Sequence, residues 1–150
     1  MILLPNQLFF EQVEAMLAEG REVQIRMKGH SMRPLLRSER DQVVLSPCTD
    51  PARLQPGDIV LFRTYGRHIL HRIVRRDGDR LTLAGDGNYR ITEQCTTRDV
   101  VGVATRAIRA SGRTVSFDSP GWRLRSRLWL SIPPWLRRQL LRVLWHTGFK

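Results

Sequence analysis

The sequence predicts a mainly β domain, a barrel or sandwich, with a helix before it and a basic helical tail after it. Three observations predict this: apolar residues at helical spacing near the start, short alternating segments from residue 21 onward, and an arginine- and tryptophan-rich end. We therefore expect an N-terminal helix (1–20), a β domain (21–118) and a tail (119–150). A chain of 150 residues can form one domain with a substantial core.

The first expected element is an amphipathic helix. Asn6 can cap its start and Gly20 can end it, so the helix is expected to run to about Glu19. Its apolar residues fall on one face, which is typical of a helix lying on a domain. They are Phe9, Phe10, Val13, Met16 and Leu17.

From Arg21 the apolar period changes from helical to two. Val23, Ile25 and Met27 alternate with polar residues, which predicts a half-buried strand. Proline, glycine, serine and aspartate separate the segments that follow, as expected for turns. The further predicted strands are 42–45, 58–62, 69–74, 80–84, 100–108 and 114–117.

Charge is distributed unevenly along the chain. The net charge is +11, and residues 121–150 carry seven Lys and Arg and no acidic residue. All four tryptophans lie in the same segment. A helix over 135–146 would have an apolar face, formed by Leu136, Leu140, Val143 and Leu144. Its other face would be polar, formed by Arg138, Gln139 and Arg142. Two interpretations stay open: contact of 121–150 with an anionic membrane surface, or packing of the helix on the β domain. Nucleic acid ranks third, although arginine-rich segments can bind phosphate.

No segment has the pattern of a signal peptide or a transmembrane helix. The longest nearly apolar stretch, residues 128–136, has nine residues and two prolines, against the ~20 needed to span a bilayer. A cytoplasmic or peripherally membrane-associated protein is therefore expected. Cys48 and Cys95 are far apart and are expected to be buried free thiols, although a disulfide between them stays open. Too few thiolates and histidines cluster to predict a metal, and no cofactor is expected.

A candidate nucleophile stands in the run Gly29, His30, Ser31, Met32, Arg33, Pro34. A serine hydroxyl needs a base that takes its proton and donors that stabilise the oxyanion. Gly29 permits a tight turn and close substrate approach, and Pro34 fixes the direction of the chain. The backbone N–H of Ser31 is the expected oxyanion donor.

The base can be sought by elimination. A lysine base must lie deprotonated near the serine, but Lys28 precedes Ser31 and Lys150 is the final residue of the sequence. Arginine does not release its proton at usable pH. Among the histidines, His30 adjoins Ser31 and His146 lies in the tail. His68 and His71 remain, and their odd spacing puts them on opposite faces of one strand.

Four motifs in order resemble the type I signal peptidases and the SOS-repressor autoproteases. They are Gly29 with Ser31-Met32-Arg33-Pro34, then Pro56-Gly57-Asp58-Ile59-Val60, Ile69-Leu70-His71-Arg72-Ile73-Val74 and Ala84-Gly85-Asp86-Gly87-Asn88. The resemblance covers residues 22–118 and not the last thirty. It implies a coiled β-barrel and a serine endopeptidase that cleaves leader or signal-type peptides. It also implies His71 as the general base, as in the endoplasmic-reticulum and archaeal type.

The third member of the site stays open. The resemblance makes Asp86 the first candidate to orient His71, although the same residues also have ordinary turn chemistry. In the Ser-His branch of this family, a second carboxylate follows a few residues after the Asp86 motif. In this chain Thr92 or its neighbour occupies that position, so Glu93 could substitute for the missing carboxylate. The alternative function is a non-catalytic or self-cleaving repressor-like binding protein of this fold. No Ala-Gly or Cys-Gly cleavage dipeptide precedes Ser31, which argues against self-cleavage.

Overall fold

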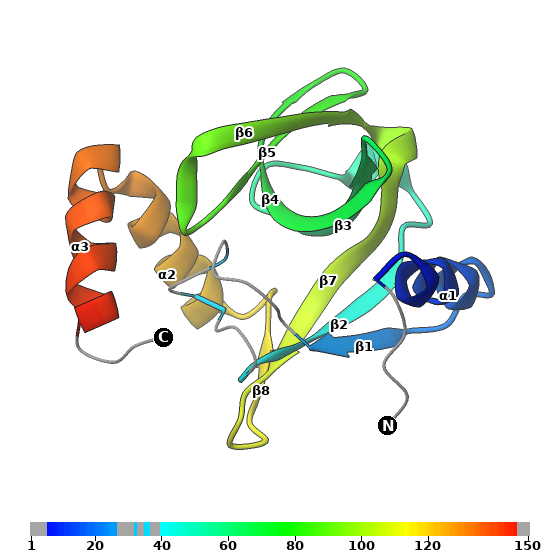
Figure 1. Cartoon of the computed structure of the whole chain (residues 1–150), viewed down its shortest axis with the longest axis horizontal. Coiled ribbons are helices and arrows are strands. Elements are labelled where there is room, and N and C mark those ends of the chain that lie inside the picture. The colour runs from blue at the N-terminus through cyan, green and yellow to red at the C-terminus, as the bar shows by residue number, and fades with distance from the viewer. Residues whose placement is uncertain (1–5, 27–31, 33–34, 37–39, 147–150) are drawn as a thin grey trace.

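The computed structural model describes residues 6–26, 32, 35, 36 and 40–146 (Figure 1). Helices lie at both ends of the described chain and eight strands lie between them. The helices are α1 (Asn6–Ala18), α2 (Pro120–Ser131) and α3 (Pro134–His146). The strands are β1 (Val23–Arg26), β2 (Gln42–Pro47), β3 (Ile59–Thr64), β4 (Arg67–Asp77), β5 (Arg80–Gly85), β6 (Asn88–Thr96), β7 (Val100–Ile108) and β8 (Thr114–Ser116).

All strand pairs are antiparallel and belong to one sheet. The order is β1-β2-β7-β3-β4-β5-β6, and β8 pairs with β7 beside this path. The part from β3 to β6 curls round, while β7 continues into a flatter part with β2 and β1 (Figure 1). Bulges in β2, β3, β4 and β5 shift the register, and such bulges bend and twist strands. The predicted mainly β class is confirmed.

The described residues form two apolar cores. One lies between α1, the flatter part of the sheet and α2, and it includes Val13, Leu17, Ile25, Val43, Leu61 and Trp122. The other lies within the curled part and includes Val60, Phe62, Ile73, Leu81, Leu83 and Cys95. Because residues of α1 and α2 share the first core with the strands, the N-terminal helix and the first part of the tail pack as parts of the β domain.

The predicted N-terminal helix is confirmed as α1. Gly20 adopts a positive φ of 82°, a conformation that suits glycine and ends helices. Val13 and Leu17 turn into the first core. Gly102 on β7 allows this close approach, because a Cβ at that position would lie 2.9 Å from Leu17 Cδ1. The helix is therefore fixed against the centre of the sheet.

Seven of the eight strands match predicted segments, and β6 was not predicted. Along β6 the polarity of the residues does not follow their burial: the apolar Ile91 is 57% exposed, whereas the polar Glu93 is partly buried. The polar Glu93 occupies the position opposite Leu83 of the second core. Because an apolar residue faces outward and a carboxylate faces inward, β6 lacks the alternation of apolar and polar residues that predicts a half-buried strand.

The tail forms two helices, and α2 packs on the sheet through Trp122, Ser126 and Trp129, which are all buried. On α3 the predicted apolar face is only partly right. Leu136, Leu140 and Leu144 are half-buried, but Val143 is 58% exposed. Within the described part of the chain, no helix combines the length and apolar character that crossing a membrane requires.

Candidate active site

The predicted nucleophile lies outside the described residues, as do its neighbours Gly29, His30 and Pro34. The residue that follows it is described. Met32 is 1% exposed and belongs to the first core. The backbone N–H of Leu36 donates to the carbonyl oxygen of Met32 at 3.0 Å. The chain is thus anchored in the core one residue after Ser31.

The predicted base is buried on strand β4. His71 is 5% exposed and stands opposite Val60 of β3 in the antiparallel register. Its Nδ1 atom lies 2.8 Å from Oε2 of Glu93. Because an ionised carboxylate can only accept, this bond requires the proton on Nδ1. In the neutral imidazole with this tautomer, the other ring nitrogen, Nε2, is an acceptor, which is the form that a general base needs.

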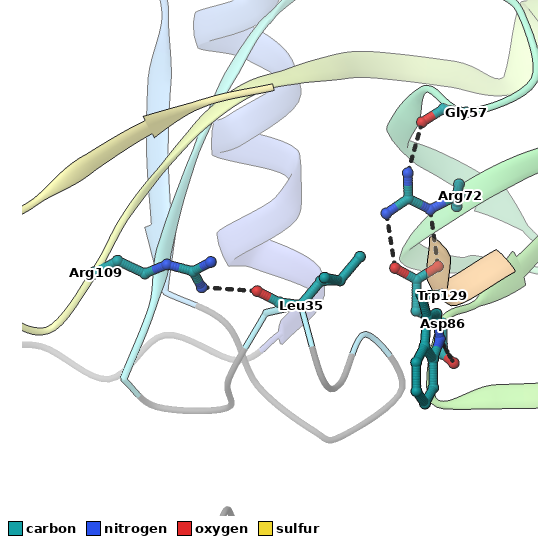
Figure 2. A network of polar contacts seen from close by, with 6 residues as sticks. All are labelled: Leu35, Gly57, Arg72, Asp86, Arg109 and Trp129. Atoms are coloured by element: carbon teal, nitrogen blue, oxygen red, sulfur yellow. Dashed lines mark hydrogen bonds and ion pairs between the residues drawn. The ribbon is translucent and has the colours of Figure 1, made fainter. Parts of the chain in front are cut away.

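Asp86, the first candidate to orient His71, has a different partner in the structure. The guanidinium of Arg72 donates from Nε and Nη2 to the two carboxylate oxygens of Asp86, both at 2.8 Å (Figure 2). Both side chains are only 1% exposed. The Asp86 carboxylate is therefore held by a buried, bidentate ion pair. Glu93, the alternative carboxylate, is the one that contacts the histidine.

The Arg72–Asp86 pair also connects two other parts of the chain. Arg72 Nη1 donates to the carbonyl oxygen of Gly57 at 3.0 Å, and Trp129 Nε1 donates to the carbonyl oxygen of Asp86 at 2.9 Å (Figure 2). These bonds join the turn before β3, the turn after β5 and helix α2. Three of the four motifs that carry the resemblance thus meet at this buried ion pair, through Gly57, Arg72 and Asp86.

His68, the other strand histidine, has different partners from His71, as the odd spacing predicts. Its Nε2 lies 2.5 Å from Oε1 of Glu14 on α1, and its ring stacks on Phe10 with centroids 4.8 Å apart. These contacts attach the β3–β4 hairpin to the N-terminal helix. His68 therefore has a structural environment, and His71 remains the candidate base.

Arg109 contacts the residues that follow the predicted nucleophile, and the sequence did not indicate this contact. It follows β7, and its Nη1 donates to the carbonyl oxygen of Leu35 at 2.7 Å (Figure 2). The same atom donates to Oδ2 of Asp41 at 2.5 Å. Leu35 stands four residues after Ser31. The contact joins residues 74 positions apart, so no local pattern could have revealed it.

A cavity of about 820 Å³ lies between helix α2 and the sheet. Asp58, Arg72, Asp86, Trp122 and Arg123 are among its lining residues, whereas His71 and Glu93 are not. Burial raises the pKa of the Asp58 carboxyl, and the negative charge of Asp118 adds to this shift. The Asp58 carboxylate still accepts a hydrogen bond from the backbone N–H of Gln55 at 3.0 Å.

Both cysteines are free, Cys48 half-buried and Cys95 buried. Burial raises the pKa of Cys48, and it raises that of Cys95 to about 11, so neither suits a nucleophilic role at neutral pH. Among the described residues, no group of three or more His, Cys, Asp or Glu side chains could hold a metal ion. Compared with models of known protein families and with curated protein sequences, the chain finds no match.

Proposed function

We propose that the chain is a serine endopeptidase of the signal peptidase kind, in which Ser31, His71 and Glu93 act together. The observation that carries the proposal is the 2.8 Å contact between His71 Nδ1 and Glu93 Oε2. It gives a buried histidine the tautomer and orientation of a general base. The curled antiparallel sheet and the four motifs in order support the same assignment.

The proposed reaction is acyl transfer. The Ser31 hydroxyl oxygen attacks the carbonyl carbon of the scissile peptide bond while its proton passes to Nε2 of His71. Glu93 stabilises the imidazolium that forms, and the backbone N–H of Ser31 is proposed as a donor to the oxyanion. The imidazolium proton then passes to the leaving amine as the C–N bond breaks. Water repeats the sequence on the acyl-enzyme and releases Ser31.

The proposed substrates are leader or signal-type peptides within precursor proteins. The test is labelling with a fluorophosphonate probe, followed by mapping of the labelled residue by mass spectrometry. We expect the label on Ser31, its loss in Ser31→Ala, and cleavage of a peptide library by wild type only. Absence of both labelling and cleavage in folded protein would favour the non-catalytic binding module. Cleavage within the chain alone would favour the self-cleaving alternative.

We further propose that the two C-terminal helices bring the enzyme to an anionic membrane surface. The outward side of α2 exposes Leu124 and Leu128, which are 58% and 56% exposed, and α3 exposes Trp135. Exposed arginines accompany them, and residues 121–150 contain no carboxylate side chain. Exposed apolar side chains among cationic ones suit the interface of an anionic bilayer. The apolar face of α3 that the sequence suggested is half-buried, so the proposed contact lies elsewhere on the helices.

A further inference from the structure

The cavity between helix α2 and the sheet lies apart from His71 and Glu93. In the register of β3, β4 and β5, Arg72 stands opposite Ile59 and Ala84, and these three residues line the cavity. His71 is the neighbour of Arg72 on β4, so its side chain points to the other face of the sheet. A ligand in the cavity would therefore not meet the histidine and its carboxylate partner.

Arginines outnumber carboxylates along the lining of this cavity. The guanidinium groups belong to Arg72, Arg123, Arg127 and Arg137, and the carboxyl groups belong to Asp58, Asp86 and Asp118. Arg72 is neutralised by Asp86 in the buried bidentate pair (Figure 2). Arg123 pairs with Asp118 at 3.3 Å, but their side chains are 59% and 90% exposed, and such a surface pair contributes little. Arg123 can therefore exchange this partner for an anionic ligand.

Helix α2 also contributes a buried hydroxyl group to the lining. Ser126 is 6% exposed, and its Oγ atom has no hydrogen-bond partner among the described residues. A buried polar group without a partner carries a free-energy cost, which an acceptor atom of a ligand would remove. Arg123 and Arg127 lie one helical turn apart, on either side of Ser126 in the sequence. The α2 side of the cavity thus offers hydrogen-bond donors to an anionic acceptor.

Apolar side chains from the sheet and from α2 line the same cavity. They include Ile59, Val103, Phe117, Trp122 and Leu130. The volume of about 820 Å³ falls within the range of small-molecule sites, which is about 300–1,000 Å³. A ligand that matches this lining has an apolar body and one anionic group.

We infer that the cavity binds a dissolved anionic amphiphile, a small molecule with a carboxylate or phosphate group on an apolar chain or ring. Its anionic group contacts Arg123, Ser126 and Arg127, and its apolar body lies against Phe117 and Trp122. This inference does not depend on the proposed peptidase function. The outward side of α2 is the surface proposed for membrane contact, whereas the cavity lies between α2 and the sheet. The occupant is therefore a dissolved molecule and not a lipid of the bilayer.

The experiment titrates the full-length protein with octanoate below its micelle concentration and measures binding by calorimetry at pH 7. Octanol, which lacks the charge, and acetate, which lacks the apolar chain, are the comparison ligands. We expect saturable binding of octanoate at one site, and binding of octanol and acetate that is weaker by about tenfold or more. Octyl phosphate should bind as octanoate does, because both carry an anionic acceptor on the same chain.

Four variants identify the groups that hold the ligand. Arg127→Gln should weaken octanoate binding about tenfold and Ser126→Ala about fivefold, because each loses a donor to the anionic group. Asp58→Asn should strengthen binding, because it removes a negative charge from the lining. Arg125→Gln is the matched control and should bind as wild type does. Arg125 is an exposed arginine of the same helix that does not line the cavity.

Two further measurements locate the ligand and distinguish its source. Octanoate should shift the amide NMR signals of residues 55–59, 84–86 and 122–127, which surround the cavity. Equal binding of octanol, or equal binding by Arg127→Gln and Arg125→Gln, would overturn the inference. Ser126→Ala should sediment with phosphatidylglycerol vesicles as wild type does. A loss in this buried, uncharged variant would place a lipid headgroup in the cavity and overturn the assignment to a dissolved ligand. If Ser126→Ala does not fold, Arg127→Gln decides the question, because Arg127 is exposed.

Discussion

The Nδ1 atom of His71 and the Oε2 atom of Glu93 lie 2.8 Å apart, although β5 separates their strands in the order of the sheet. The curl of β3 to β6 brings the two side chains together at the second core (Figure 1). In the proposed mechanism, this carboxylate sets the tautomer and the orientation of His71.

The nucleophile and the base should behave as one unit. Ser31→Ala and His71→Ala should each reduce kcat on the order of 10⁶-fold, and the double variant should lose little more, because removal of either residue stops the same proton transfer. The measurement is single-turnover cleavage of a peptide substrate by the two single variants and the double variant. Effects that multiply in the double variant would show that the two residues act separately.

Glu93→Gln should impair turnover far more than stability. Glutamine can still accept from His71 Nδ1 but cannot stabilise the imidazolium, so kcat should fall on the order of 10³- to 10⁴-fold. The free energy of unfolding should change by about 1 kcal/mol. Chemical denaturation and kinetics on the same preparation separate the two quantities. Near-normal turnover in Glu93→Gln would remove Glu93 from the catalytic group.

Asp86→Asn should impair stability far more than turnover. The substitution leaves the Arg72 guanidinium buried without its counter-charge, and breaking such a pair costs about 3–5 kcal/mol. Turnover per folded molecule, measured by active-site labelling at low temperature, should remain close to wild type. A large loss of kcat without loss of stability would return Asp86 to the role of orienting residue.

Asp58→Asn should stabilise the protein at neutral pH. The folded-state pKa of Asp58 is raised above its ordinary value of 3.8, chiefly by burial. Protonation therefore favours the folded state, and this contribution is lost as pH rises from 3.8 through the folded-state pKa. The free energy of unfolding of Asp58→Asn should exceed that of wild type at pH 7, and the difference should shrink toward pH 3.8. A difference that grows on acidification would contradict the assigned shift.

The membrane proposal is tested with point variants, because truncation before α2 would remove part of the first core. In sedimentation with vesicles rich in phosphatidylglycerol, Leu124→Gln and Leu128→Gln should each weaken binding on the order of tenfold. Arg138→Gln and Arg142→Gln should each weaken it about fivefold, with a smaller effect at high salt. Ile91→Gln is the control, because Ile91 is 57% exposed but lies on β6. Equal binding by all these variants would exclude this surface.

The predictable part of the fold was the part with a regular apolar period. Val23 and Ile25 alternate with polar residues, and Val13 and Leu17 recur at helical spacing, so local sequence determines which side of each element is buried. Strand β6 was missed because its inward position opposite Leu83 is the carboxylate Glu93. Glu93 therefore obscures the strand pattern in the sequence, and it is also the residue that contacts His71.

The order of the motifs predicted only part of the candidate site. His71 could be selected from the histidines, but the choice between Asp86 and Glu93 depends on which carboxylate the curled sheet turns toward it. The resemblance makes Asp86 the first candidate, but the order of the motifs does not reveal that its partner is Arg72. Arg109 meets Leu35 only after β7, β2 and the first core have assembled, and such long-range contacts leave no local signal.

The distribution of tryptophan has a practical consequence for spectroscopy. All four tryptophans occur after residue 120, and Trp122 and Trp129 are buried against the sheet. Intrinsic fluorescence therefore reports on the seating of α2 and its neighbour, while the curled strands contribute no indole emission. Circular dichroism follows the strands and helices together. If α2 separates before the strands unfold, the two optical transitions will not coincide, and a stability derived from fluorescence alone will describe the helix instead of the whole protein.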